Sequence, residues 1–481
     1  DDEGDYIRLG EIRSFKRADK NKRRPTVDFV YDEPFELFSS HVYAKGSLIL
    51  TMLRDVLGEE GFWRSIRNYT NENKLKNVET NDLKKTIEMT TGQNLDWFFK
   101  QWLYEPGFPN YDVSWNYNQR KKELSIHVKQ TQDLKTTSLF KMPIKIIVDS
   151  GEKKEHVIWV DNLDSVYKIK SDKRPKMVIF NSGQRVPSNL KMQKSVADLK
   201  YQLQNASNAL DRIWAAQELS KKKGRKVVEY TLMEAAKKDP FWAVRKEAYT
   251  SLGRLKTKII SEDIDWVKRK EIDNRVKRSF IKILKNQKNN LEVSKFLEDI
   301  IISDTSYYAI SESIRTLAII DTAAAKPHVD KLLNTESHND VIRKAALSYF
   351  SQVQTASNYM RLKELAKYGN FSWPSRPTII YELSKYQKKR PSTFDFILSF
   401  FDDNDRFVRM AVIAQVGNYG GESNYSLLDI MVEKDPVLSI NAKRAKSKIE
   451  NRKNSSSKKS DSKAVEILDK KLRAIKNILN D

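Results

Sequence analysis

The chain has 481 residues, of which 39% are hydrophobic and 10% aromatic, so it can form several buried cores and is not disordered throughout. It contains no cysteine, which excludes disulfides, thiolate metal sites and cysteine nucleophiles but leaves the compartment open between the cytoplasm and the cell envelope or periplasm. The formal net charge is +23, yet the basic clusters are scattered and interrupted by acids, so we expect no specific nucleic-acid partner.

The chain has no stretch of 18 apolar residues, and we therefore expect no membrane span. It begins at Asp1-Asp2-Glu3, without a start methionine. We expect this beginning to be that of a processed or truncated protein, and it gives no information about targeting.

Residues 1–110 are predicted to begin as a polar, loop-like stretch and to become helical near Ser39. The first helix is expected to end at Gly58, because glycine favours the left-handed conformation of a C-terminal cap. Gly92 is expected to end a later helix, and Asn94 can cap the next one. The apolar residues of the first predicted helix share one face: Leu48, Ile49, Met52, Leu53, Val56 and Leu57.

Residues 111–190 alternate between apolar and polar side chains, as Tyr111, Val113 and Trp115 illustrate. Six or seven short strands separated by turn residues fit into about 75 positions. This pattern predicts a small β-sandwich, which we expect to act as a spacer because it carries no catalytic grouping.

Residues 196–450 are predicted to be helical and repetitive. Arg245, Arg343 and Arg409 are separated by 98 and 66 residues, close to three and two periods of 33, and each follows an aspartate-containing turn. The pattern predicts a solenoid of HEAT-type helix pairs, in which the aspartate caps the next helix and the arginine bonds to the preceding turn. An irregular helical bundle is the alternative.

Residues 451–481 are expected to form a polar linker and a terminal amphipathic helix. The linker, Asn454 to Ser462, is rich in serine and lysine. The helix after it either caps the repeats, which we favour, or meets a partner.

The sequence contains no group of residues spaced as the ligands of a metal site. No two histidines lie three or four residues apart, and no His-Glu-x-x-His motif occurs, so no zinc site can be assembled from this chain. Phosphate-binding glycine loops and Gly-x-Ser-x-Gly elbows are absent as well. The five histidines are His41, His127, His156, His328 and His338.

One segment carries more information: Tyr43-Ala44-Lys45-Gly46, which leads into an apolar helix. A tyrosine at a helix start is usually a packing residue. Here, however, the Tyr-x-Lys-Gly element is followed in order by further short motifs. They are Thr80-x-Asp82-Leu83, Thr91-Gly92-x-Asn94-Leu95, Phe98-Phe99-x-Gln101-Trp102 and Pro106-Gly107-x-Pro109.

This ordered series, over about residues 35–115, resembles the end of the catalytic domain of the aminopeptidase N-like gluzincins, a family of zinc metalloaminopeptidases. The sandwich and helical repeats follow in the order that the family uses. The resemblance implies a multidomain, mainly α protein with four parts. They are the end of a gluzincin catalytic helical domain over residues 1–110, a β-sandwich over 111–190, an α-solenoid of HEAT-like repeats over 196–450, and the segment 451–481.

The resemblance also implies a mechanism, in which zinc activates a water molecule and a tyrosine donates its hydroxyl to the oxyanion of the tetrahedral intermediate. Tyr43 matches that catalytic tyrosine, and a phenol is a hydrogen-bond donor. Lys45 and Gly46 match the motif and are interpreted as structural, with the glycine permitting a close helix contact. The substrate is expected to be a peptide.

The other parts of that active site have no counterpart in this chain. The zinc ligands, the general base and the strand that recognises the substrate amine would precede Asp1. We therefore expect zinc to be bound by the full-length parent and not by this chain, to which the upstream catalytic half is the expected partner. The chain alone is predicted to be inactive.

Two alternatives remain open at this point. One is a catalytically inactive, aminopeptidase-like scaffold that uses HEAT repeats for protein interaction. The other is a HEAT-type interaction module with an incidental N-terminal bundle. The intact Tyr-x-Lys-Gly element favours the enzyme, since a scaffold has no need of the Tyr43 hydroxyl.

Overall fold

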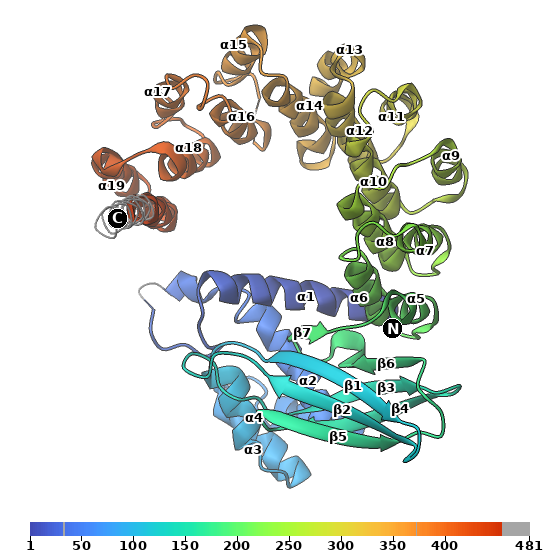
Figure 1. The fold of residues 1–481 in the computed structure, drawn as a ribbon. Coiled ribbons are helices and arrows are strands. Elements are labelled where there is room, and N and C mark those ends of the chain that lie inside the picture. Colours follow the sequence, from blue (N-terminus) through green and yellow to red (C-terminus); the bar gives the residue numbers. More distant parts are fainter. Residues whose placement is uncertain (32–33, 372, 455–481) are drawn as a thin grey trace, which may run out of the picture. The chain divides into compact units, whose positions relative to one another are not determined.

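The computed structural model describes residues 1–31, 34–371 and 373–454 and divides the chain into two compact units, Asp1–Thr257 and Lys258–Asp481. Both units are rich in helices, and the first also holds two small sheets (Figure 1). The mainly helical character predicted from the sequence is confirmed. The predicted terminal helix lies outside the described residues, as does the linker after Asn454.

The first helix, α1 (Asp2–Asn21), shows that the prediction of a loop-like start was wrong. The Asp1 carboxylate accepts a hydrogen bond of 2.7 Å from the backbone N–H of Gly4 and so caps the helix. Leu9, Ile12 and Phe15 are buried along one face, while most of the other positions are charged or polar. The abundance of charges hides a narrow apolar stripe of helical spacing.

Three further helices complete the N-terminal bundle. Gly58 has φ 72° and ψ 166°, so it interrupts α2 where the sequence predicts an end. Gly92, at φ 69°, ends α3 in the left-handed conformation, as expected. The side chain of Asn94 accepts from the N–H of Asp96 at 3.1 Å, but the N-cap of α4 is Leu95 and not the predicted Asn94. The bounds are α2 (Tyr43–Glu72), α3 (Thr80–Thr91) and α4 (Asp96–Phe99), which a π-helical turn (Lys100–Tyr104) continues.

Seven strands follow, in two sheets of four and three. The first sheet has the order β5-β2-β1-β7, with β7 parallel to β1 and the other pairs antiparallel, and the second has the antiparallel order β4-β3-β6. The strands are β1 (Asn110–Asn118), β2 (Glu123–Gln130), β3 (Met142–Asp149), β4 (Lys153–Val160), β5 (Asp164–Lys170), β6 (Met177–Phe180) and β7 (Asn189–Met192).

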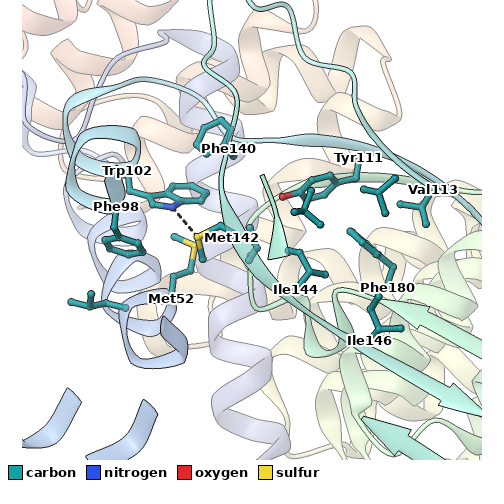
Figure 2. Packing of buried hydrophobic residues seen from close by; sticks show 14 of the residues in the cluster. Met52, Phe98, Trp102, Tyr111, Val113, Phe140, Met142, Ile144, Ile146 and Phe180 are labelled. Atoms are coloured by element: carbon teal, nitrogen blue, oxygen red, sulfur yellow. Dashed lines mark hydrogen bonds between the residues drawn. The ribbon is translucent and has the colours of Figure 1, made fainter. Parts of the chain in front are cut away.

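One hydrophobic core joins the helical bundle to both sheets. Figure 2 shows Trp102 of the π-helical turn beside Met142 of β3, with the indole N–H 3.3 Å from the methionine sulfur. Tyr111 of β1 and Phe180 of β6 meet edge to face, with ring centroids 5.2 Å apart. The N-terminal helices and the sheets therefore stabilise one another through a common apolar interior.

Four helices close the first unit. They pack with each other and, through α6, against α1. Trp242 of α8 also reaches α1, where its indole N–H donates to Glu3 at 2.7 Å and its ring meets Tyr6 at a centroid distance of 4.7 Å. The bounds are α5 (Val196–Asn205), α6 (Ala209–Leu219), α7 (Lys226–Lys238) and α8 (Trp242–Leu255).

The second unit is helical in the part that the structure describes. Many helices pack against a neighbour in sequence, against the next but one, or against both, as α12 does with α10, α11, α13 and α14. The helices are α9 (Ser261–Lys270), α10 (Asn274–Ile283), α11 (Leu291–Ser303), α12 (Tyr307–Ile320), α13 (Thr322–Leu333), α14 (Val341–Gln352), α15 (Ala356–Leu365), α16 (Ser375–Ser384), α17 (Thr393–Leu398), α18 (Arg406–Tyr419) and α19 (Tyr425–Lys434).

The predicted capping by aspartate is confirmed at one of the three repeat turns. Asp405 is the N-cap of α18, and its side chain accepts from the N–H of Phe407 at 2.8 Å. Asp239 accepts from the N–H of Phe241 at 2.9 Å but does not cap α8, whose N-cap is Phe241. The side chain of Asp340 does not cap α14. Its backbone has φ 52°, and its carboxylate accepts a hydrogen bond of 2.6 Å from Arg343. The capping role predicted for Asp340 was therefore wrong.

The predicted arginine contacts to the preceding turn are confirmed. Arg245 donates to the carbonyl of Asp239 at 3.0 Å, Arg409 to that of Asp403 at 2.7 Å, and Arg343 to that of Leu333 at 2.7 Å. A basic residue and an aspartate 26 or 27 residues later also pair repeatedly. These pairs are Arg212–Asp239, Lys277–Asp304, Arg376–Asp403 and Arg409–Asp435.

Candidate functional site

Tyr43 is the first residue of α2, and 61% of its surface is exposed. Its ring packs loosely against Phe38, at a centroid distance of 6.2 Å. Its backbone N–H donates to the carbonyl of Ser39, which fixes the turn that starts the helix. The hydroxyl is therefore accessible to a ligand while the backbone that carries it is held.

The segment before Tyr43 is tied to the rest of the bundle by side chains. Arg24 donates to the hydroxyl of Ser39 at 2.5 Å and to the carbonyl of Glu36 at 2.7 Å. The hydroxyls of Ser14 and Ser40 are 2.8 Å apart, which joins α1 to the start of α2. The position of Tyr43 thus depends on α1, the helix that sequence reasoning missed.

Lys45, two residues after Tyr43, is fully buried. Its ammonium group donates to the carbonyl of Glu105 at 3.2 Å and lies 5.3 Å from the centre of the Phe15 ring. Burial lowers the pKa of Lys45 to about 8, although the charge of Asp19 opposes this shift. Lys45 therefore links the start of α2 to α1 and to the end of the bundle, which supports its interpretation as structural.

Gly46 does not have the role expected of it. A Cβ atom added at Gly46 would meet no other atom within 4 Å, so the glycine permits no close helix contact in this structure. That part of the prediction was wrong.

A second buried polar pair, Asp19 and His41, lies beside Lys45. The Nε2 atom of His41 is 3.8 Å from Oδ1 of Asp19, and neither side chain is more than 3% exposed. Oδ1 of Asp19 and both ring nitrogens of His41 have no hydrogen-bond partner among the described residues. Arg23 contacts the other oxygen of Asp19 at 3.3 Å. This pair was missed, since Asp19 gives no signal in the sequence.

Two exposed aromatic rings lie beside Tyr43. The ring of Phe38 is 6.2 Å from that of Tyr43 and 5.7 Å from that of Phe35, and Phe35 and Phe38 are exposed by 70% and 66%. Phe29 and Val30, earlier in the same stretch of sequence, are each exposed by 83%. Exposed aromatic side chains that cluster beside an accessible hydroxyl are typical of a surface that another group covers. We call residues 29–43 the aromatic segment; Asp32 and Glu33 within it are not described.

The described residues offer no metal site. Among residues 1–31, 34–371 and 373–454, no three His, Cys, Asp or Glu side chains gather closely enough to hold a metal ion. The zinc ion implied by the resemblance therefore does not fit the side chains described, and its assignment to the parent protein stays a prediction. In the same ranges, no helix has both the length and the hydropathy needed to span a bilayer.

The segment that contains Tyr43 is similar to a known protein family. Residues 12–102 match the model of the peptidase family M1 domain. The chain is 32% identical over 111 residues to a protein named probable aminopeptidase 1 from Saccharolobus solfataricus, covering 23% of this chain and 14% of that one. It is 37% identical over 79 residues to an aminopeptidase N from Lactococcus lactis, covering 16% and 9%.

The fold is similar to that of a solved structure. The crystal structure of Legionella pneumophila aminopeptidase A in complex with aspartic acid matches with a TM-score of 0.64 and 15% identity. The match covers 92% of this chain and 62% of that one. The aligned segments thus span only part of each relative, about a seventh or less of the two curated sequences. The predicted resemblance to the aminopeptidase N-like family is confirmed, whereas the HEAT-type repeats stay a prediction.

Proposed function

We propose that this chain, whose residues 12–102 match the peptidase family M1 domain, is the C-terminal portion of a zinc-dependent aminopeptidase and contributes Tyr43 as its oxyanion donor. The observation that carries the proposal is the placement of Tyr43. Its side chain is exposed at the start of α2, inside the segment that matches the family, and the backbone around it is fixed by buried contacts.

The chemistry follows from the hydroxyl group. When a nucleophile adds to the peptide carbonyl, negative charge develops on the carbonyl oxygen, and a donor already in place stabilises it without reorganisation. The N-terminal end of α2 carries a partial positive charge, which also favours an anion there. Removing one such donor typically costs roughly 3–4 kcal/mol in the transition state, or about 10²- to 10³-fold in kcat.

We further propose that the upstream catalytic half of the parent, which would bring the zinc site and the general base, covers the aromatic segment. Two observations support this partner: the exposed rings of Phe35 and Phe38 beside the accessible side chain of Tyr43, and the exposed side chain of Phe29 in the same segment. Burying side chains of this size typically contributes about 1.5–3 kcal/mol each. The substrate is proposed to be a peptide, whose N-terminal residue is removed.

The remaining regions are proposed to keep the family's architecture. Buried side chains from both sheets, such as Ile126 and Ile144, share one core, which supports a β-sandwich over residues 111–190. The basic–acidic pairs that recur 26 or 27 residues apart support HEAT-like repeats over residues 196–450.

The test is to compare the chain with its full-length parent. We expect chelator-sensitive release of N-terminal residues from peptides by the parent and none by the chain alone. Release of N-terminal residues by the purified chain would refute the assignment of the missing residues to an upstream half. A parent that carries degenerate zinc ligands and releases nothing would instead support the catalytically inactive scaffold.

A further inference from the structure

The first unit contains a pocket of about 510 Å³ that Tyr43 does not line. Side chains of α1, β6, β7, α5 and α6 form its walls. Its volume falls in the range of roughly 300–1,000 Å³ that small-molecule sites usually have. Apolar side chains make up part of the wall, among them Leu190 and Trp214, both of which are partly exposed.

Two desolvated lysines lie in the wall of this pocket. Lys194 is 8% exposed; its ammonium group donates to the carbonyl of Val178 at 2.5 Å and to Gln202, and lies 5.4 Å from the centre of the Trp214 ring. Lys16 donates to the carbonyl of Ser188 at 2.8 Å. Burial lowers the pKa of each of these lysines to about 8.

Neither lysine has a carboxylate within ion-pair distance among the described residues. The two acids of the wall are engaged elsewhere. Asp211 accepts from the hydroxyl of Ser182 at 2.6 Å and from the N–H of Gly183 at 2.9 Å, and Glu218 pairs with Lys221. The charges of Asp211 and Asp198 only partly offset the burial of Lys194, and no acid among the described residues offsets that of the half-buried Lys16. A desolvated ammonium without an ion-pair partner is costly, and an anion in the pocket would supply that partner.

The excess of basic side chains in the wall also favours an anionic ligand. Arg13 and Arg17 of α1 add two exposed guanidinium groups to the two lysines, so four basic side chains face two acidic ones. Each lysine still has donor capacity beyond the bonds described, because an ammonium group has three N–H donors.

We propose that this pocket binds a small organic anion, which places a carboxylate or phosphate group on Lys16 and Lys194 and an apolar body against Leu190 and Trp214. This site is independent of the proposed peptidase chemistry, because none of its wall residues belongs to the start of α2. It is a binding site for a regulator or a second ligand, and not for the scissile bond.

The test is isothermal titration calorimetry on the full chain at pH 7.5 with three probes: phenyl phosphate, benzoate and the neutral benzamide. We expect saturable binding of at least one anion, about tenfold or more tighter than that of benzamide. The stronger of the two anions identifies the charged group. Repeating the titration at pH 8 in buffers with different ionisation heats should show proton uptake on binding, because an anion raises the pKa of both lysines.

Four substitutions locate the site. Lys16→Met and Lys194→Met should each weaken anion binding about tenfold, as expected for one charge-assisted hydrogen bond. Lys20→Met and Lys191→Met remove exposed charges from the same helix and the same strand region and should change binding less than twofold. Circular dichroism checks that each variant is folded. If the Lys194→Met variant is unstable, the variant at the half-buried Lys16 still tests the proposal.

Two results would overturn the proposal. One is the absence of saturable binding for both anions, or equal affinity for benzamide. The other is anion binding that neither Lys16→Met nor Lys194→Met weakens in folded protein.

Discussion

Replacing Lys45 with methionine should change the stability of the first unit by an amount that depends on pH. The ammonium group of Lys45 is fully buried and makes one hydrogen bond, to the carbonyl of Glu105. Burial lowers the pKa of Lys45 from its usual 10.5 to about 8, whereas an unfolded chain restores the usual value. Between these two pH values the unfolded state binds more protons than the folded state.

The sign and size follow from proton linkage. Because the unfolded state holds the extra proton, the free energy of unfolding of the wild-type protein rises with pH between about 8 and 10.5. At about 1.4 kcal/mol per pH unit, the contribution of Lys45 over this window is at most about 3.5 kcal/mol. Methionine has no proton to exchange, so the wild type should gain about 2–3 kcal/mol relative to Lys45→Met between pH 7 and pH 10.

Urea denaturation followed by tryptophan fluorescence is a suitable assay, because seven of the nine tryptophans lie in the first unit. Lys20→Met, on the exposed side of α1, controls for the loss of a positive charge and should differ from wild type by less than about 0.5 kcal/mol at either pH. A stability difference between wild type and Lys45→Met that stays constant from pH 7 to pH 10 would refute the argument that Lys45 is desolvated.

The remaining predictions concern the backbone and the repeats. Gly58→Ala should destabilise the first unit by about 1–3 kcal/mol, because φ 72° and ψ 166° are accessible to glycine alone. Gly10→Ala, at an unobstructed position inside α1, should stabilise the unit by about 0.5–1 kcal/mol. Thermal melts in which Gly58→Ala is the more stable of the two variants would contradict this. Arg376→Met should lower the free energy of unfolding of the second unit by about 3–5 kcal/mol in urea melts, because the buried Asp403 carboxylate loses its ionic partner. Lys434→Met, at an exposed ion pair, should lower it by less than about 1 kcal/mol. Similar losses for these two variants would show that the Arg376–Asp403 pair stabilises the unit no more than an exposed ion pair does.

Local signals in the sequence were sufficient to predict the structure where a single residue determines the backbone conformation. Gly92 ends α3 because it adopts a positive φ, and the side chain of Asn94 accepts from the N–H of Asp96 in the turn that leads into α4. The alternation that includes Tyr111 and Val113 predicted a strand, and both side chains are buried on one face of β1. These effects act within a few residues, so no tertiary information was needed.

The surroundings of Tyr43 could not be predicted in the same way. The α1 helix was missed because charged residues separate Leu9, Ile12 and Phe15, and only packing against α2 shows that they form one face. Lys45 did carry a signal, because it lies three and seven residues before Leu48 and Met52 and so falls on the apolar stripe of α2. Its partners, the Glu105 carbonyl and the Phe15 ring, come from distant parts of the chain.

The role of Tyr43 is tested most directly by Tyr43→Phe in the full-length parent, with zinc content measured alongside the kinetics. The account predicts that kcat falls about 10²- to 10³-fold while KM and zinc content change little, because only the transition state loses a hydrogen bond. Tyr104→Phe, at another partly exposed tyrosine of the same bundle, should retain activity. Full activity in the folded, zinc-loaded Tyr43→Phe protein would contradict the proposal that this chain supplies the oxyanion donor.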